Sequence, residues 1–273
     1  MTPSISLPAP AAAGKARRPA GDPFGSLAPW SARLLNRFLP PERRYSRRLE
    51  RIARWDRPIA GRRARLAAWA NMLFVDHGVF RLAYANLFRV TDELWRSSQP
   101  SPGQIAAFAR RGGRTIVNLR GGREHGSWPL QREACERHGV ALVDFVLRSR
   151  EPPDREALLR LPQLFDGLLY PVLVHCKSGA DRAGLFAALF LMVREGATVA
   201  DARRQLSLRF GHFRFAKTGI LDAFLDAYER DGEARGVAFL DWVANGYDPA
   251  ALAGTYRSGF WSSLVADRLI RRE

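Results

Sequence analysis

The feature that most constrains this chain is a ten-residue stretch, His175 to Gly184, set between two apolar runs. The run before it, Pro171-Val172-Leu173-Val174, is short, β-branched and bounded by proline, which predicts a buried strand. The run after it, residues 184–193, is longer and rich in Leu, Ala and Phe, which predicts a helix. A glycine-containing loop between a strand and a helix N-terminus directs backbone N–H groups and the positive end of the helix dipole into one space. The sequence therefore predicts an anion site, and most naturally a phosphate site.

Two side chains give this loop a chemistry. Cys176 stands at its start, where the same field favours the thiolate, the nucleophilic form of cysteine. Arg182 closes the loop with a planar guanidinium that can hold two phosphate oxygens at once. We therefore expect transfer of a phosphoryl group to sulfur; the alternative is a buried, inert cysteine with a solvent-facing arginine. The expected phosphate-binding residues are Lys177, Ser178, Gly179, Ala180, Asp181 and Arg182.

The pattern H-C-x-x-G-x-x-R, written here as His175, Cys176, Gly179 and Arg182, resembles the signature loop of the cysteine-dependent protein tyrosine and dual-specificity phosphatases. The segments Trp95–Pro100 and Val117–Arg120 are also similar to sequence around the active site of the bacterial dual-specificity-like branch. The resemblance covers about residues 94–230. It implies that Cys176 forms a cysteinyl-phosphate that water then hydrolyses, that His175 orients the cysteine, and that no cofactor or metal takes part.

The residue that protonates the leaving group is the least determined part of the site. Asp181, directly before the arginine, resembles the acid of myotubularin-like lipid phosphatases and is the first candidate; its alternative role is a helix N-terminal carboxylate. Tyrosine phosphatases usually carry this acid on an upstream loop, which makes Asp144 the second candidate. Glu151 and Asp154 lie in a further loop and are the third.

Two loop positions bear on the substrate and the rate. Lys177 resembles loops that take highly anionic substrates, including inositol lipids. Ala183 stands where the family usually has Ser or Thr, whose hydroxyl stabilises the departing thiolate, so we expect a slow second step. The expected function is protein tyrosine or dual-specificity phosphatase. The alternatives are a phosphoinositide or inositol-phosphate phosphatase and a weakly active phosphate-binding module.

Strands that alternate with helices predict an α/β fold with a mostly parallel central sheet flanked by helices on both faces. We expect strands near residues 94–97, 115–119, 140–146 and 172–174. A basic helical extension would precede this domain and a helical tail would follow it. The expected organisation is a disordered arm (1–25), the basic helical extension (26–93), the catalytic domain (94–230) and the C-terminal helical tail (231–273).

The net charge of +16 is concentrated ahead of the expected catalytic domain, in an arginine-dense stretch over residues 43–65. Helices are predicted over Glu42–Trp55 and over Arg62–Leu87. The basic region could dock onto the catalytic domain, or contact an anionic membrane surface peripherally through residues 30–65. Nucleic acid is the least expected partner, because no recognised binding motif accompanies the charge. With two cysteines and no secretory signal, we expect a cytoplasmic protein, peripheral at the inner membrane surface if the membrane alternative holds.

Overall fold

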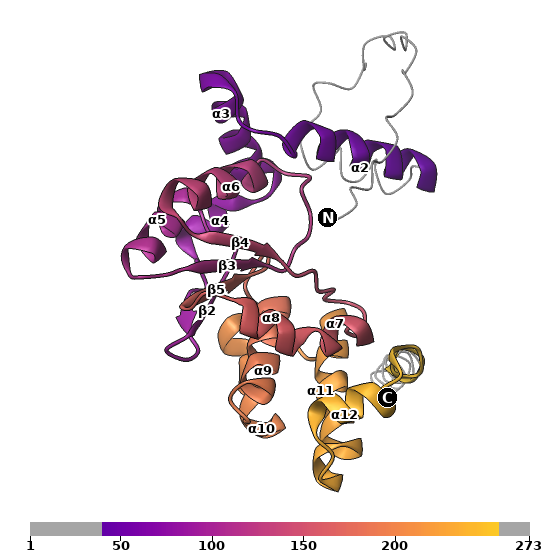
Figure 1. Ribbon diagram of the computed structural model, residues 1–273. Helices are drawn as coiled ribbons and strands as arrows, with labels where there is room; N and C mark the ends of the chain where they lie inside the picture. Colours follow the sequence, from indigo (N-terminus) through magenta and orange to yellow (C-terminus); the bar gives the residue numbers. More distant parts are fainter. Residues whose placement is uncertain (1–39, 257–273) are drawn as a thin grey trace, which may run out of the picture. The chain divides into compact units, whose positions relative to one another are not determined.

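The computed structural model describes residues 40–256 (Figure 1). The chain falls into two compact units, Met1–Pro41 and Glu42–Glu273, and the fold described here belongs to the second. The predicted arm over residues 1–25 lies outside the described residues. The predicted domain boundaries after residues 93 and 230 stay predictions.

The central sheet has five strands in the order β1-β2-β5-β3-β4. β1 is antiparallel to β2, and the other neighbours are parallel, which confirms the predicted mostly parallel sheet. His175 lies beside Ser97 on one side and Asn118 on the other, so the carboxyl ends of three strands meet at one edge. The strands are Phe88–Arg89 (β1), Leu94–Ser97 (β2), Thr115–Asn118 (β3), Ala141–Asp144 (β4) and Val172–His175 (β5).

The helices alternate with the strands along the chain (Figure 1). They are Pro41–Trp55 (α2), Gly61–Ala70 (α3), Gly78–Ala83 (α4), Pro102–Arg110 (α5), Ser127–His138 (α6), Arg155–Leu159 (α7), Leu161–Gly167 (α8), Asp181–Val193 (α9), Val199–Ala202 (α10), Ile220–Asp231 (α11) and Phe239–Asn245 (α12). The helix predicted over Glu42–Trp55 is confirmed. The single helix predicted over Arg62–Leu87 is wrong: α3 continues as a π-helical turn, Asn71–Val75, and the chain then breaks at His77, which adopts a left-handed conformation with φ 58°.

Both faces of the sheet are covered. Val172 and Val174 of β5 face the larger core, which includes α8, α9 and α11, while Leu173 faces the smaller core with α5 and α6. α9 is buried on nearly every side, and its Phe186 ring packs edge-on against Phe165 with centroids 5.6 Å apart. This explains why the run after the loop is apolar throughout rather than amphipathic.

The described part of the tail, up to residue 256, packs into the larger core as well. Phe224 of α11 lies among the rings of Phe239, Trp242 and Tyr247, with centroid distances of 5.2–6.2 Å. The Tyr247 hydroxyl donates to the carbonyl of Pro153 at 2.8 Å, which ties the tail to the loop before α7. The last described helical residues are 249–256.

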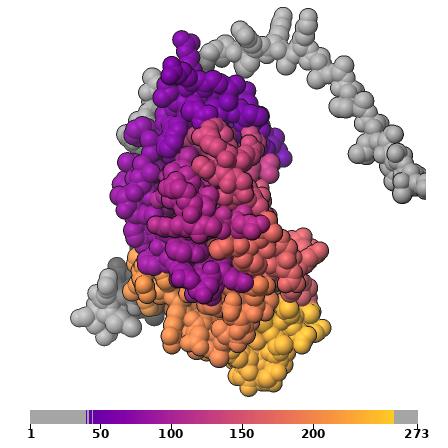
Figure 2. All heavy atoms as spheres, turned by 60° about the vertical axis from the view of Figure 1, so that its left-hand side comes forward, coloured from indigo at the N-terminus to yellow at the C-terminus, as the bar shows by residue number. Residues whose placement is uncertain are grey.

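The described part of the basic extension docks against α6. Trp55, Ala68 and Met72 form a small core with Leu130, and Figure 2 shows the indigo and violet residues directly against the magenta ones. Ion pairs join the same surfaces: Arg48 and Arg51 bind Glu124, and Arg65 binds Glu133. Docking is therefore a structural role of this region. Membrane contact through residues 30–65 stays a prediction, and no helix within residues 40–256 is long and apolar enough to cross a bilayer.

We expect Phe186→Ala to lower the free energy of unfolding by about 3–5 kcal/mol, because it removes a fully buried ring from the centre of the larger core. Urea denaturation followed by circular dichroism measures the change. Phe215→Ala is the control, since Phe215 is 94% exposed. Equal losses in the two variants would contradict this assignment of the core.

Candidate active site

Cys176 lies where β5 ends and the loop to α9 begins. It is 1% exposed, and the backbone N–H of Gly179 donates to its Sγ at 3.2 Å. The loop then crosses to Asp181, the first residue of α9. The predicted strand, loop and helix therefore place the thiol at the bottom of a turn of backbone amides, at the positive end of a 13-residue helix.

Side chains from elsewhere in the fold hold the carbonyl groups of this loop. Asn86 Nδ2 donates to the Ser178 carbonyl at 2.9 Å. Arg96 Nη2 donates to the carbonyls of Gly179 and Ala180 at 2.7 and 3.0 Å. Within each planar peptide unit the C=O and the following N–H point in opposite directions. The next three N–H groups, of residues 179–181, are therefore directed away from these side chains, and that of Gly179 reaches the thiol.

Only glycine fits at position 179. Its φ is +77°, a conformation that other residues adopt at a cost. A Cβ there would lie 2.6 Å from the backbone N of Ser98 and 2.7 Å from the carbonyl carbon of Ser97. The loop thus lies against the end of β2, and the glycine of the sequence motif has both a torsional and a steric reason.

Arg182 lies in the first turn of α9 and is partly buried. Its Nη1 donates to the carbonyl of Leu119, just after β3, at 3.4 Å. This contact spans the carboxyl ends of two neighbouring strands. It positions a bidentate cation at the same edge of the sheet as the thiol.

His175 joins the loop to a buried chain of hydrogen bonds. Its Nε2 lies 2.7 Å from Gln131 Nε2, which donates, so the ring proton is on Nδ1, 3.2 Å from the carbonyl of Cys176. Burial lowers the pKa of His175 to about 3, so the ring is neutral. The chain continues through Gln99, which donates to Gln131 at 2.5 Å and accepts from Arg120 at 2.8 Å.

Asp76, from the extension, closes this chain. Its carboxylate is fully buried and accepts from both Nη atoms of Arg120 at 2.8 Å and from Arg81 at 2.9 Å. Lys177 Nζ lies 3.3 Å from the same carboxylate, so the predicted phosphate-binding lysine is paired with Asp76. Burial alone would raise the pKa of Asp76, but the bound Arg120 and the nearby Arg81 hold it well below its usual range.

Of the four candidate acids, only Asp181 belongs to the loop, and its Oδ1 lies 2.8 Å from His212 Nδ1. The others bind donors elsewhere. Asp144, on the edge strand β4, accepts from Asn118 at 2.8 Å and pairs with Arg123 at 3.2 Å, Asp154 caps α7 through the N–H of Ala157 at 2.9 Å, and Glu151 pairs with Arg148 at 2.6 Å.

The sequence reasoning missed the partners that hold the loop. Arg96 lay within a flank similar to known phosphatases, which was its only signal, and Asn86 gave none. Asp76 stands out only as an acid in a basic and apolar stretch. His212 lies in an aromatic and basic segment, residues 210–215, and nothing in that segment points to Asp181.

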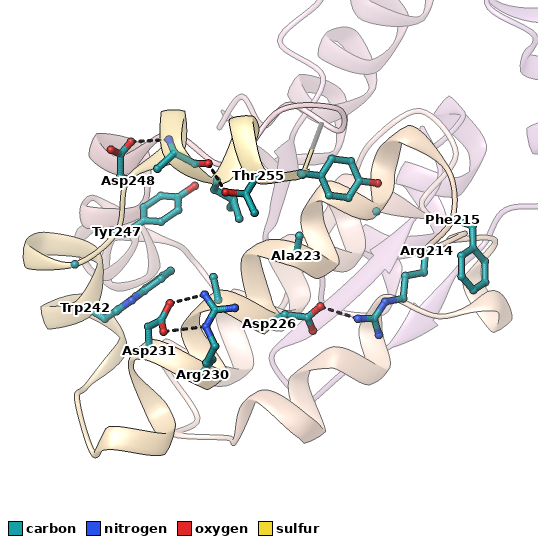
Figure 3. A pocket seen from close by; sticks show the side chains of 16 residues that line it. Arg214, Phe215, Ala223, Asp226, Arg230, Asp231, Trp242, Tyr247, Asp248 and Thr255 are labelled. Atoms are coloured by element: carbon teal, nitrogen blue, oxygen red, sulfur yellow. Dashed lines mark hydrogen bonds and ion pairs between the residues drawn. The ribbon is translucent and has the colours of Figure 1, made fainter. Parts of the chain in front are cut away.

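A cavity of about 990 Å³ lies away from this loop, between α11, α12 and residues 249–256 (Figure 3). Four of its charged lining residues form two ion pairs, Arg214 with Asp226 and Arg230 with Asp231, each at 2.6 Å, and Asp248 accepts the backbone N–H groups of residues 250 and 251. None of residues 175–182 lines it. The cavity is therefore separate from the candidate active site.

Part of this chain is similar to known phosphatases. Residues 85–220 match the family described as "DSP-PTPase phosphatase fused to NAD+ Kinase". The dual specificity protein phosphatase TpbA of Pseudomonas aeruginosa is 30% identical over 139 residues, 48% of this chain and 54% of that protein. A beta-lactamase hydrolase-like protein of Xylella fastidiosa is 35% identical over 103 residues, 36% of this chain and 23% of that protein. The chain thus spans about half the length of TpbA and 23% of the length of the Xylella protein.

Among solved structures, the crystal structure of Pseudomonas aeruginosa TpbA is similar, with a TM-score of 0.45 and 21% sequence identity. The similarity covers 63% of this chain and 91% of that chain.

Gly179→Ala should abolish binding of inorganic phosphate, because the loop cannot keep its conformation against β2. Gly139→Ala is the matched control: its φ of +63° carries a similar torsional cost, about 1–2 kcal/mol, but its Cβ would meet open space. Isothermal titration calorimetry measures phosphate binding, and urea denaturation measures the free energy of unfolding of the two variants. Phosphate binding by Gly179→Ala at the unaltered affinity would show that the close approach is not needed.

Asp76→Asn should lower the free energy of unfolding by about 3–5 kcal/mol, since it leaves two buried guanidinium groups without a counter-charge. Asp56→Asn, at a 26% exposed ion pair with Arg123, should cost about 1 kcal/mol or less. Because folding lowers the pKa of Asp76, its contribution is present above the ordinary aspartate range, about pH 4, and is lost as the pH falls. The gap between wild type and Asp76→Asn in urea denaturation should therefore narrow in acid; a gap independent of pH would contradict the assignment.

Proposed function

We propose that this chain, in which residues 85–220 belong to the dual-specificity-like family of cysteine-dependent phosphatases, hydrolyses phosphomonoesters through a cysteinyl-phosphate on Cys176. The observation that carries the proposal is the Gly179 N–H donating to Cys176 Sγ at 3.2 Å, within a loop whose carbonyls are held from behind. A loop with N–H donors directed at sulfur in this way stabilises a thiolate before substrate binds. It then presents the same donors to the phosphoryl oxygens.

In the proposed first step the Cys176 thiolate attacks phosphorus in line, and the bond from phosphorus to the ester oxygen breaks. The loop amides and the Arg182 guanidinium hold the non-bridging oxygens, whose charge persists through the transition state. In the second step water attacks the cysteinyl-phosphate and inorganic phosphate leaves. Asp181 is the candidate acid nearest in the sequence to Cys176 and Arg182, and we assign proton transfer to it.

The name of the Pseudomonas relative supports a phosphorylated protein as the substrate, and we propose protein tyrosine or dual-specificity activity. The inositol-phosphate alternative depended on Lys177, and the ion pair with buried Asp76 does not favour it. The remaining alternative is a weakly active phosphate-binding module. A measurement of turnover distinguishes it from an enzyme.

Cys176→Ser should reduce hydrolysis of p-nitrophenyl phosphate to the background rate, because a serine hydroxyl is a far weaker nucleophile than a cysteine thiolate. Cys135→Ala is the control and should keep the wild-type rate: Cys135 is buried in α6, and burial raises the pKa of its thiol to about 12. Retention of activity in Cys176→Ser would overturn the proposal.

Ala183→Ser should accelerate turnover, because the added hydroxyl can donate to the thiolate as the cysteinyl-phosphate breaks. Ala183 is fully buried in the same core as Cys176, so the melting temperature must be measured alongside. In a wild-type enzyme limited by this step, a burst of nitrophenol precedes a slower steady rate. In the serine variant the steady rate of nitrophenol release should approach the burst rate. An unchanged steady rate in a folded variant would contradict the proposal that the missing hydroxyl slows the second step.

A further inference from the structure

Behind Asp181 lies a buried row of three ionisable groups. His212 is 2% exposed, and its ring connects two carboxylates: Nδ1 lies 2.8 Å from Asp181 Oδ1, and Nε2 lies 2.7 Å from Asp222 Oδ2. Asp222, on α11, is 3% exposed. His212 lies in the segment between α10 and α11, so the row reaches from the loop into the larger core.

Hydrogen bonding and charge favour an imidazolium in this row. Each ring nitrogen faces an oxygen of an aspartate side chain. With both aspartates ionised, each oxygen accepts but cannot donate, so only the imidazolium, which has two N–H donors, satisfies both contacts. Burial opposes the charged ring, but the hydrogen bonds to Asp181 and Asp222 outweigh it and raise the pKa of His212 to about 9. Arg96 interacts electrostatically with Asp181, and Tyr256 with Asp222.

This arrangement presents Asp181 as a carboxylate rather than as an acid. Its Oδ1 accepts from a cation, and its side chain is 23% exposed, so the carboxylate can still reach a water molecule at the loop. The other candidate acids also act as acceptors. Asp144 and Glu151 pair with arginines, and Asp154 accepts a backbone N–H. Among these four candidates, none is arranged as a proton donor.

We propose that His212, supported by Asp222, is a positioning residue that commits Asp181 to act as the base of the second step and not as the acid of the first. The consequence concerns the substrate. A leaving group that departs without a proton must be stable as an anion, so the enzyme selects aryl phosphates, with phosphotyrosine as the protein substrate, over alkyl phosphates such as phosphoserine. This inference rests on the proposed phosphatase function.

The steps balance as follows. In the first, the S–P bond forms, the P–O bond breaks, and the electron pair leaves on the aryl oxygen, which takes its proton from solvent. In the second, water forms a new O–P bond, its proton passes to Asp181, and the S–P bond breaks with its electron pair returning to sulfur. Asp181 then loses the proton to solvent.

The first experiment separates the two steps in the full chain. For nitrophenyl, phenyl and alkyl phosphates, kcat/KM reports formation of the cysteinyl-phosphate, and the decay of radiolabelled phosphoenzyme after acid quench reports its hydrolysis. We expect kcat/KM of the wild type to fall steeply along this series. Asp181→Asn should slow the decay about a hundredfold while lowering kcat/KM for the two aryl esters by the same small factor. A loss of kcat/KM that is larger for phenyl than for nitrophenyl phosphate would overturn the proposal, since Asp181 would then be the acid.

The second experiment tests His212 directly. In His212→Asn the carboxyl of Asp181 no longer accepts from the imidazolium, so it is able to donate a proton to a leaving group. The ratio of kcat/KM for nitrophenyl over phenyl phosphate should then fall by about threefold or more, whereas a purely structural role would lower both values together and leave the ratio unchanged. His138→Asn, at an exposed position late in α6, is the matched control.

If His212→Asn does not fold, Asp222→Asn, which weakens the imidazolium, must give the same shift in ratio. An unchanged ratio in the folded variant overturns the proposal. Wild-type hydrolysis that is absent, or that survives Cys176→Ser, would instead refute the proposed function.

Discussion

The buried carboxylate of Asp76 is the charge on which this site depends. It lies in the extension and binds Arg81 and Arg120, and Lys177 of the loop lies 3.3 Å away. A buried guanidinium is costly without a counter-ion, so Asp76 stabilises the buried side chains of Arg81 and Arg120. Through Arg120 the same charge fixes two glutamine side chains, and through them the neutral ring of His175.

The loop is shaped from outside as much as by its own residues. Carbonyl groups are bound by Asn86 and Arg96, and the close approach at Gly179 presses the loop against the end of β2. These partners come from the segment before the sheet and from its second strand, far from residue 176 in sequence. The Gly179 N–H therefore donates to the thiol before any anion arrives, which is the kind of preorganisation that electrostatic catalysis requires.

The parts of this protein that could be predicted from sequence are those with local causes. A β-branched run, a glycine loop and an apolar run predicted β5, the loop and α9, and with them the positions of Cys176 after the strand and Arg182 at the start of the helix. What could not be predicted depends on contacts between distant segments: a buried aspartate has no periodic signature, and His212 meets Asp181 only after the chain has returned across α9. The prediction of one helix over residues 62–87 was wrong because the helix ends where His77 adopts a left-handed conformation. The spacing of the apolar residues does not reveal that change in the backbone.

The family match begins at residue 85, whereas Asp76 lies nine residues before it. A fragment cut at the edge of the matched segment would keep Arg120 and Lys177 but lose Asp76, the carboxylate that pairs with both, together with Arg81. The segment that matches the family and the segment that holds these ion pairs therefore have different boundaries in this chain. A fragment can keep the residues of the signature loop without keeping Asp76, so the extension matters for the stability of the structure around that loop.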